Sequence, residues 1–183
     1  NEVNAAIGAA REMGATEILI SDSHGNGENL LIEQLPSDIQ LIRSWPRPLM
    51  MMEGIDETFD AVIFMGYHSS TTNMEGVRAH TISSANLTAI RLNGIEMLEA
   101  SINAAIAGDF GVPVVMISGD DAVVEEAQRV VGDMEGAVVK WALGFHSART
   151  LMPEAGYEVI RTHVRAALNR LEDFEPYVRE GPI

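Results

Sequence analysis

Two histidines and a glutamate have the residue types and positions that could bind a catalytic metal ion. His24 and His68 each follow an apolar run, in the segments ILISDSH and FMGYH, and Glu99 lies in the segment IEMLEAS. The chain has no cysteine, so histidine, aspartate and glutamate would have to supply every ligand. Two imidazoles and one carboxylate leave a position open for water, and zinc in such a centre lowers the pKa of that water to about 7. The set therefore predicts metal-assisted hydrolysis, although each histidine could instead be a hydrogen-bonded structural residue.

Other polar residues could serve in catalysis or substrate binding. His80, in the segment RAHTIS, is a candidate general acid–base or electrostatic stabiliser. Asp120, Asp121 and His146 are weaker candidates for substrate binding. They follow expected strands or precede expected helices. The alternative for these aspartates, and for Asp22, is that they cap helices and turns, which is a common role of aspartate. His163 lies within a long helical pattern and is interpreted as a surface or structural residue.

Glu99 carries the strongest argument among the candidates. A helix is expected over residues 95–108, and Glu99 lies within its apolar stripe, which is formed by Ile95, Leu98, Ile102 and Ile106. An unpaired carboxylate on a buried face costs several kcal/mol, so this one should be paired, protonated or bound to a metal ion. The alternatives are that it reaches water from the edge of the stripe, or that it pairs with Arg78 or Arg91.

The elements that must position these residues alternate along the chain. Strands are expected near 16–21, 39–43, 60–66, 112–118 and 136–140, with further β-rich segments near 80–84 and 87–92. Helices are expected near 3–13, 28–35, 95–108, 120–132 and 153–172. This order predicts an α/β fold, with a mostly parallel sheet, helices on both faces and a single domain over residues 1–183. Ligands of such sheets bind at the carboxyl ends of the strands, and several candidate residues directly follow an expected strand. The long polar loop 67–79 is a further candidate for a functional segment.

Composition excludes some kinds of partner. The chain has 183 residues, of which 46% are hydrophobic, and its formal net charge is -15. Nucleic acid and anionic membrane would be repelled, and no apolar run reaches the roughly 18 residues that a membrane span needs. The absence of cysteine suits the reducing cytoplasm, which is the expected location. We therefore expect no nucleic-acid or membrane partner.

Several segments resemble one enzyme family. ATEILISDSHG, EGIDETFDAVIFMGYHS, RAHTIS, LNGIEMLEASINAAIAGDFGVPVVMISGDD and AVVKWA resemble, in this order and spacing, the zinc-dependent D-aminopeptidases of the bacterial dipeptide-transport operon, the DppA type. The resemblance implies that His24, His68 and Glu99 are zinc ligands and that His80 is catalytic. It further implies two zinc ions per subunit, release of N-terminal D-residues such as D-alanine from short peptides, and a ring-shaped homodecamer.

The chain departs from the family pattern at both ends. The family opens with a strand that ends in an Asp-x-Glu pair of zinc ligands, and its chains continue past the segment REGPI. We therefore expect residues 1–183 to be an internal portion of a longer enzyme, in which metal occupancy is partial or nil. Two other functions stay open at this point. One is a non-catalytic small-molecule or metal-binding α/β protein, and the other is a metal-dependent amidohydrolase that acts on a non-peptide bond.

Overall fold

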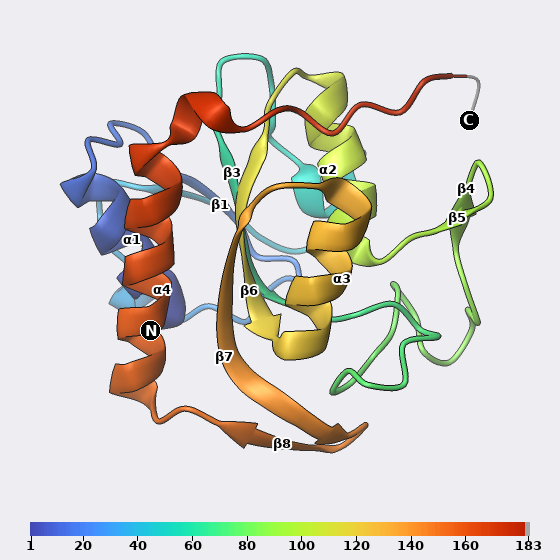
Figure 1. Ribbon diagram of the computed structural model, residues 1–183. Coiled ribbons are helices and arrows are strands. Elements are labelled where there is room, and N and C mark those ends of the chain that lie inside the picture. Colours follow the sequence, from blue (N-terminus) through green and yellow to red (C-terminus); the bar gives the residue numbers. More distant parts are fainter. Residues whose placement is uncertain (182–183) are drawn as a thin grey trace.

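The fold is built around a central four-stranded sheet. The computed structural model describes residues 1–181. The strand order is β3-β6-β7-β8 (Figure 1), with β3 at Val62–Tyr67, β6 at Val114–Asp120, β7 at Glu135–Gly144 and β8 at Ser147–Thr150. Strands β3, β6 and β7 run parallel, and only β8 pairs antiparallel with its neighbour. The predicted α/β architecture with a mostly parallel sheet is confirmed.

Helices cover both faces of this sheet, as predicted. One face carries α1 and α4, and the other carries α2 and α3 (Figure 1), with bounds Glu2–Glu12, Pro153–Asn169, Glu99–Asp109 and Asp121–Val131. All seven residues of β6 are buried, because this strand has neighbours on both edges and helices on both faces. The packed face of α1 consists of small side chains that allow close approach to α4, namely Ala5, Ala6, Ala9 and Ala10.

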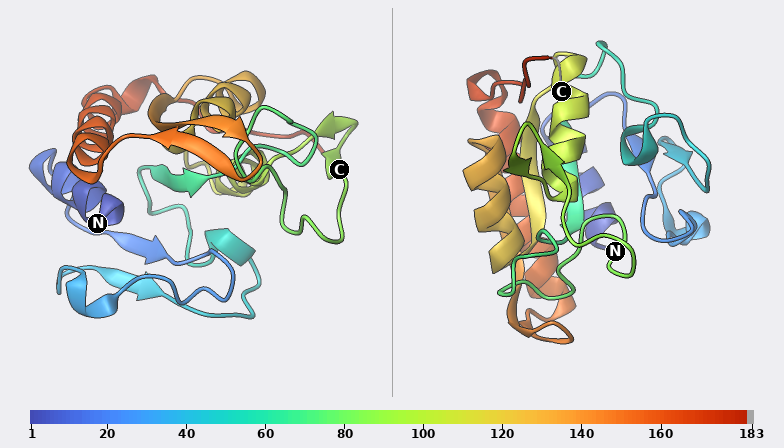
Figure 2. Two further views of the ribbon diagram at one scale, coloured as in Figure 1. Left: turned by 90° about the horizontal axis from the view of Figure 1, so that it is seen from below. Right: turned by 90° about the vertical axis from the view of Figure 1, so that its right-hand side faces the viewer.

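Two smaller strand pairs lie outside the central sheet. Strands β1 (Leu19–Ser21) and β2 (Gln40–Ile42) form a parallel pair that lies beyond β3 (Figure 2). Strands β4 (Arg91–Leu92) and β5 (Ile95–Glu96) form a short antiparallel hairpin. Three single-turn 3₁₀-helices complete the described elements, namely η1 (Ile32–Gln34), η2 (Met50–Met52) and η3 (Leu171–Asp173).

The structure corrects several predicted elements. The helix expected over 28–35 is wrong, since only η1 forms there. The segment 80–84 contains no strand, and 87–92 contains only β4. The expected sheet also lacked β8. The sequence pattern of β8 was weak, because the strand has only four residues and three of them are exposed.

The helix expected over 95–108 begins at Glu99 instead. Asn93 and Gly94 both have positive φ angles, of 50° and 80°, and form the two-residue turn of the β4–β5 hairpin. This Asn-Gly pair is the strongest short-range hairpin signal in a sequence, and it takes Ile95 out of the helix. The predicted apolar stripe is therefore wrong at Ile95, which is 39% exposed, but Leu98 belongs to the core and Ile106 packs against it. The helix also packs on the core through Ala100, Ala104 and Ala107, which the stripe did not include.

Within residues 1–181, no helix combines the length and the apolar character needed to cross a membrane.

Candidate metal centre

His68 and His80 lie side by side at the carboxyl edge of the sheet. His68 directly follows β3, and His80 stands in the long segment between β3 and β4, which has no helix or strand. The two ring centroids are 5.0 Å apart. The pair is held through the backbone, because the N–H group of His80 donates to the carbonyl oxygen of Ser69 at 3.0 Å. The loop thus brings together two histidines that are separated in the sequence.

Glu99 faces the same point. Its side chain is buried, with the residue only 8% exposed, and its Oε1 atom accepts a hydrogen bond from the N–H group of Ile82 at 2.8 Å. The Nε2 atom of His80 lies 3.6 Å from this oxygen. Glu99 is the first residue of α2, where the helix dipole favours negative charge. Its predicted burial is confirmed, and it lies between the buried Leu98 and Ala100.

Neither arginine that could have paired with Glu99 forms an ion pair with it. Arg91 lies 3.6 Å from Glu96 in the β4–β5 hairpin, and the guanidinium of Arg78 contacts His146. Among the described residues, the only basic side chain within 4 Å of Glu99 is therefore the imidazole of His80. This leaves the carboxylate without a permanent counter-charge, a state that a bound cation would compensate.

The ring nitrogens of both histidines are oriented by carbonyl groups. Nδ1 of His80 donates to the carbonyl oxygen of Arg78 at 2.7 Å, and Nδ1 of His68 lies 3.3 Å from that of Val77. Such contacts fix the tautomer and direct Nε2 toward a ligand, as in many metal-bound histidines. Burial and the nearby charges of His80 and Lys140 lower the pKa of His68 to about 4. His68 is therefore a neutral imidazole at neutral pH, which is the form that binds metal ions.

His24 stands apart from this group. It is exposed, and its Nδ1 atom lies 3.4 Å from Oδ1 of Asn29. A small electrostatic effect of His24 acts in the same direction as burial on the pKa of His68. Within residues 1–181, no three histidine, aspartate or glutamate side chains already surround one point at ligand distance. Imidazole nitrogens and carboxylate oxygens are nevertheless donor types that zinc accepts.

The turn that carries His24 is held by Asp22. This residue is 5% exposed, and its carboxylate accepts hydrogen bonds from the N–H groups of Asn29 and Leu30 and from the Asn29 amide, at 2.6, 2.8 and 3.0 Å. Burial acts to raise the pKa of Asp22, but these hydrogen bonds outweigh it and hold the pKa below its ordinary value. Asp22 is therefore a capping residue of this turn, which is the alternative that the sequence left open.

The three weaker candidates occupy different surroundings. Asp120 is fully buried, and its two oxygens accept the N–H groups of Val123 and Val77, at 2.8 Å each. Asp121 is exposed and accepts the N–H group of Ala142 at 3.3 Å. His146 is exposed at the tip of the β7–β8 hairpin. Asp120 thus caps α3 and anchors the loop, while substrate binding by Asp121 and His146 stays a prediction.

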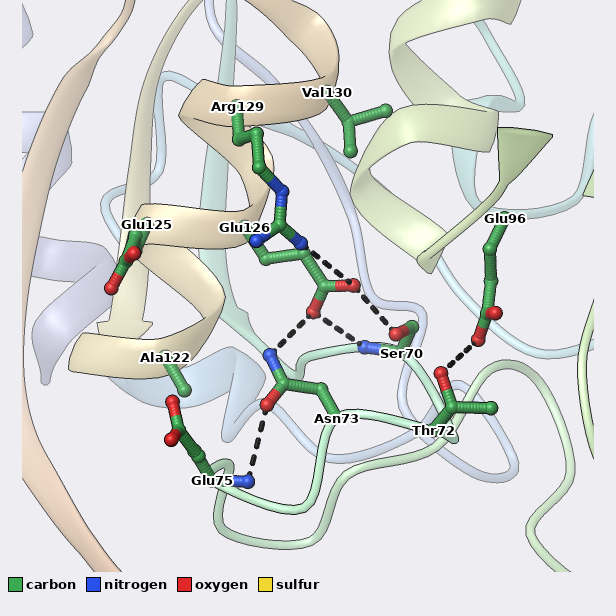
Figure 3. A pocket seen from close by; sticks show the side chains of 10 residues that line it. All are labelled: Ser70, Thr72, Asn73, Glu75, Glu96, Ala122, Glu125, Glu126, Arg129 and Val130. Atoms are coloured by element: carbon green, nitrogen blue, oxygen red, sulfur yellow. Dashed lines mark hydrogen bonds and ion pairs between the residues drawn. The ribbon is translucent and has the colours of Figure 1, made fainter.

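Two charged residues near the site were missed by the sequence reasoning. Arg47 is 8% exposed, and its guanidinium donates to Oγ of Ser21 and to the carbonyl oxygen of Asp22, at 2.7 and 2.6 Å. Glu126, on α3, is 5% exposed and lines a pocket of about 440 Å³ beside the loop (Figure 3). The signal for Arg47 was its place between two prolines in WPRP. Glu126 had none, because glutamates are common on helix surfaces.

Comparison with known proteins supports one family throughout the chain. The family model described as D-aminopeptidase matches residues 1–183. A D-aminopeptidase of Bacillus subtilis (strain 168) is 31% identical over 175 residues, which cover 96% of this chain and 63% of that protein. The solved Zn-dependent D-aminopeptidase DppA from Bacillus subtilis, a self-compartmentalizing protease, has a TM-score of 0.94 at 30% identity, over 98% of this chain and 65% of that one. The chain thus spans less than two thirds of the length of each relative. As its sequence segments predicted, the chain belongs to the D-aminopeptidase family.

Proposed function

We propose that the protein is a zinc-dependent aminopeptidase that releases N-terminal D-residues, such as D-alanine, from short peptides. The observation that carries this proposal is the convergence of His68, His80 and the buried Glu99 at the carboxyl edge of the sheet. Family membership supports hydrolysis over a passive binding role. The similarity to relatives named as D-aminopeptidases supports peptides with D-residues over other amide substrates.

In this proposal His24, His68 and Glu99 hold the metal. Zinc, when bound, supplies a nucleophilic water near neutral pH and polarises the scissile carbonyl group. His68 offers Nε2 as a neutral donor, because its pKa is low and its Nδ1 atom faces the carbonyl oxygen of Val77. Glu99 offers one carboxylate oxygen that is already oriented by the N–H group of Ile82.

In this proposal His80 is the general acid–base. Its Nδ1 atom is committed to the carbonyl oxygen of Arg78, so only Nε2 is free to accept or donate a proton. Nε2 faces the edge of the site occupied by Glu99, 3.6 Å from the carboxylate. From this position the imidazole can pass a proton to the leaving amine or stabilise the negative oxygen of the tetrahedral intermediate.

We further propose two zinc ions per subunit and a homodecameric ring, on the basis of the family resemblance. The solved relative is a self-compartmentalizing protease, which supports an assembly without giving this chain's subunit number. Elemental analysis of the full-length protein and its mass in solution by light scattering test these two numbers separately.

The activity itself is tested with paired substrates. The full-length protein is assayed with the p-nitroanilides of D-alanine and L-alanine, and with the matching dipeptides, before and after chelation. Zinc-dependent release that is faster for the D-substrates supports the proposal. A protein that binds zinc and hydrolyses neither series, but cleaves a non-peptide amide, would identify the amidohydrolase alternative. A protein without zinc or turnover would be a passive binder.

A further inference from the structure

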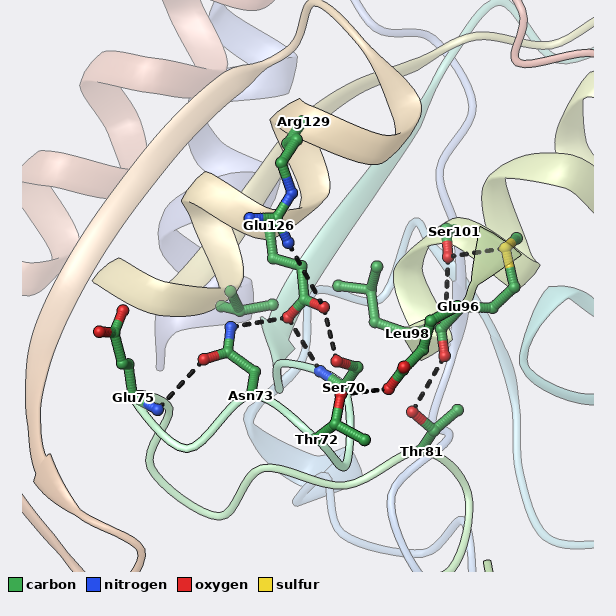
Figure 4. A network of polar contacts seen from close by, with 12 residues as sticks. Ser70, Thr72, Asn73, Glu75, Thr81, Glu96, Leu98, Ser101, Glu126 and Arg129 are labelled. Carbon is green, nitrogen blue, oxygen red and sulfur yellow. Dashed lines mark hydrogen bonds and ion pairs between the residues drawn. The ribbon is translucent and has the colours of Figure 1, made fainter. Parts of the chain in front are cut away.

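Glu126 is a buried carboxylate that faces the loop between His68 and His80. One oxygen accepts the N–H group of Ser70 at 3.0 Å and the side-chain amide of Asn73 at 2.9 Å, and the other accepts the hydroxyl of Ser70 at 2.5 Å (Figure 4). Arg129, one helical turn along, approaches to 3.9 Å. Three charge-assisted hydrogen bonds therefore compensate the burial of this charge, and all three come from the loop.

The loop segment held by Glu126 also holds His80. Ser70 accounts for two of the three hydrogen bonds, and the preceding residue, Ser69, accepts the backbone N–H group of His80 at 3.0 Å. His68 lies directly before Ser69. A displacement of Ser70 would therefore move the backbone on which both histidines depend. Glu126 itself belongs to a helix and does not contact either ring, so it acts only through this segment.

Glu125, the neighbour of Glu126 on α3, has none of these contacts. It is exposed and lines the same pocket (Figure 3), but within residues 1–181 it accepts no hydrogen bond and forms no ion pair. The two glutamates carry the same charge on the same helix. A comparison of substitutions at the two positions therefore separates the effect of the hydrogen bonds to Ser70 and Asn73 from the effect of a negative charge near the site.

We propose that Glu126 is a positioning residue, which sets the relative placement of His68 and His80 through its hydrogen bonds to Ser70 and Asn73. Its role in catalysis rests on the proposed peptidase function. The role in placing the two rings does not depend on that function, since it follows from the contacts of the chain itself.

Three replacements separate geometry from charge. Glu126→Ala removes every acceptor and leaves the Ser70 N–H group without a partner. Glu126→Asp keeps the charge but withdraws the carboxylate by one methylene. Glu126→Gln keeps the shape, because its amide oxygen can accept from Ser70 N–H and Asn73 while its amide nitrogen donates to the Ser70 hydroxyl. Glu125→Ala is the matched control.

The test uses the full-length protein in two measurements. The first is the NMR ring signals of His68 and His80, assigned in the metal-free protein. His163 is the reference, because it lies on α4 and pairs with Glu135, the first residue of β7, away from the loop. The second is kcat and KM for D-alanine p-nitroanilide with zinc.

We expect Glu126→Ala and Glu126→Asp to shift the signals of His68 and His80 but not that of His163. In both variants kcat should fall about 10- to 100-fold, as for residues that orient metal ligands, with KM changed less than kcat. Glu126→Gln and Glu125→Ala should resemble the wild type in both measurements.

Unchanged ring signals in Glu126→Asp and Glu126→Ala would overturn the proposal. If Glu126→Ala does not fold, the comparison of Glu126→Asp with Glu126→Gln decides. Changed ring signals in Glu126→Asp with wild-type signals in Glu126→Gln support positioning, whereas changed signals in Glu126→Gln would show that the charge is required and would overturn the proposal. A wild type without peptidase activity would contradict the proposed function alone, and the ring signals would still test the placement of the histidines.

Discussion

The Nε2 atom of His80 lies 3.6 Å from Oε1 of Glu99, and this contact joins the loop after β3 to the first turn of α2. The carboxylate is buried, and the same oxygen also accepts a hydrogen bond from the backbone N–H group of Ile82. An imidazole in this position can exchange a proton within the site, whereas the ring of His68 is kept neutral by its surroundings. The two histidines are thus expected to differ in function.

Replacement of His80 by alanine should affect turnover and spare the metal. We expect kcat of the full-length protein to fall by about 10²- to 10⁴-fold, the range for loss of a general acid–base, while zinc per subunit stays at the wild-type value. Steady-state kinetics and elemental analysis on the same preparation measure both. His163→Ala is the control, because His163 lies on α4 and its ring pairs with Glu135 of β7 rather than with the site. Wild-type turnover in His80→Ala would remove His80 from the mechanism.

Replacement of His68 by alanine should affect the metal itself. We expect zinc content after dialysis to fall, and activity to return only at about 10- to 100-fold higher free zinc, as for loss of a ligand or of its support. Titration with a zinc indicator dye measures the affinity directly. Equal zinc affinity in His68→Ala and wild type would contradict the ligand assignment, whatever happens to turnover.

The Asp22 turn predicts a pH dependence of stability. Hydrogen bonds from Asn29 and Leu30 overcome the effect of burial and hold the folded-state pKa of Asp22 below its unfolded value of 3.8. A depressed carboxylate pKa adds stability that is present above the unfolded pKa and is lost as pH falls through the folded pKa. Asp22→Asn should therefore unfold at lower urea concentration than wild type at pH 7, and the gap should narrow as the pH falls below 3.8. A gap of constant size down to pH 2.5 would contradict this origin.

Gly76 and Ser69 should be coupled in stability. A Cβ atom at position 76 would lie 1.8 Å from Oγ of Ser69, a side chain that is fully buried and whose hydroxyl has no hydrogen-bond partner among the described residues. We expect Gly76→Ala to cost about 1–3 kcal/mol of unfolding free energy, the usual range for overpacking. Adding Ser69→Ala removes the clashing oxygen and should restore part of this loss, because the Ser69 Cβ would still lie 3.0 Å from the new atom. Additive effects in a double-mutant cycle would show that the clash is not the cause.

Regular patterns in the sequence predicted most of the sheet and all four α-helices, with the start of α2 misplaced. Strand β6 has a run of apolar residues that identifies a strand buried on both faces, and α3 has apolar residues at helical spacing. The error at the start of α2 had a local cause, because the Asn93-Gly94 turn pairs Ile95 and Glu96 with β4 and delays the helix to Glu99. The helix expected over 28–35 fails as well, and only the single turn η1 forms there.

The sequence by itself determined the α/β order of elements, the family, and the residue types from which a metal site could be built. Local periodicity and short motifs carry this information, because they depend on neighbours within a few residues. Only the tertiary structure decided which of those residues meet: His80 beside Glu99, His68 beside His80, His24 on an exposed turn, and Glu126 against Ser70. These contacts join segments far apart in the chain, and their geometry depends on how helices and loops pack on a shared sheet, which no local pattern contains.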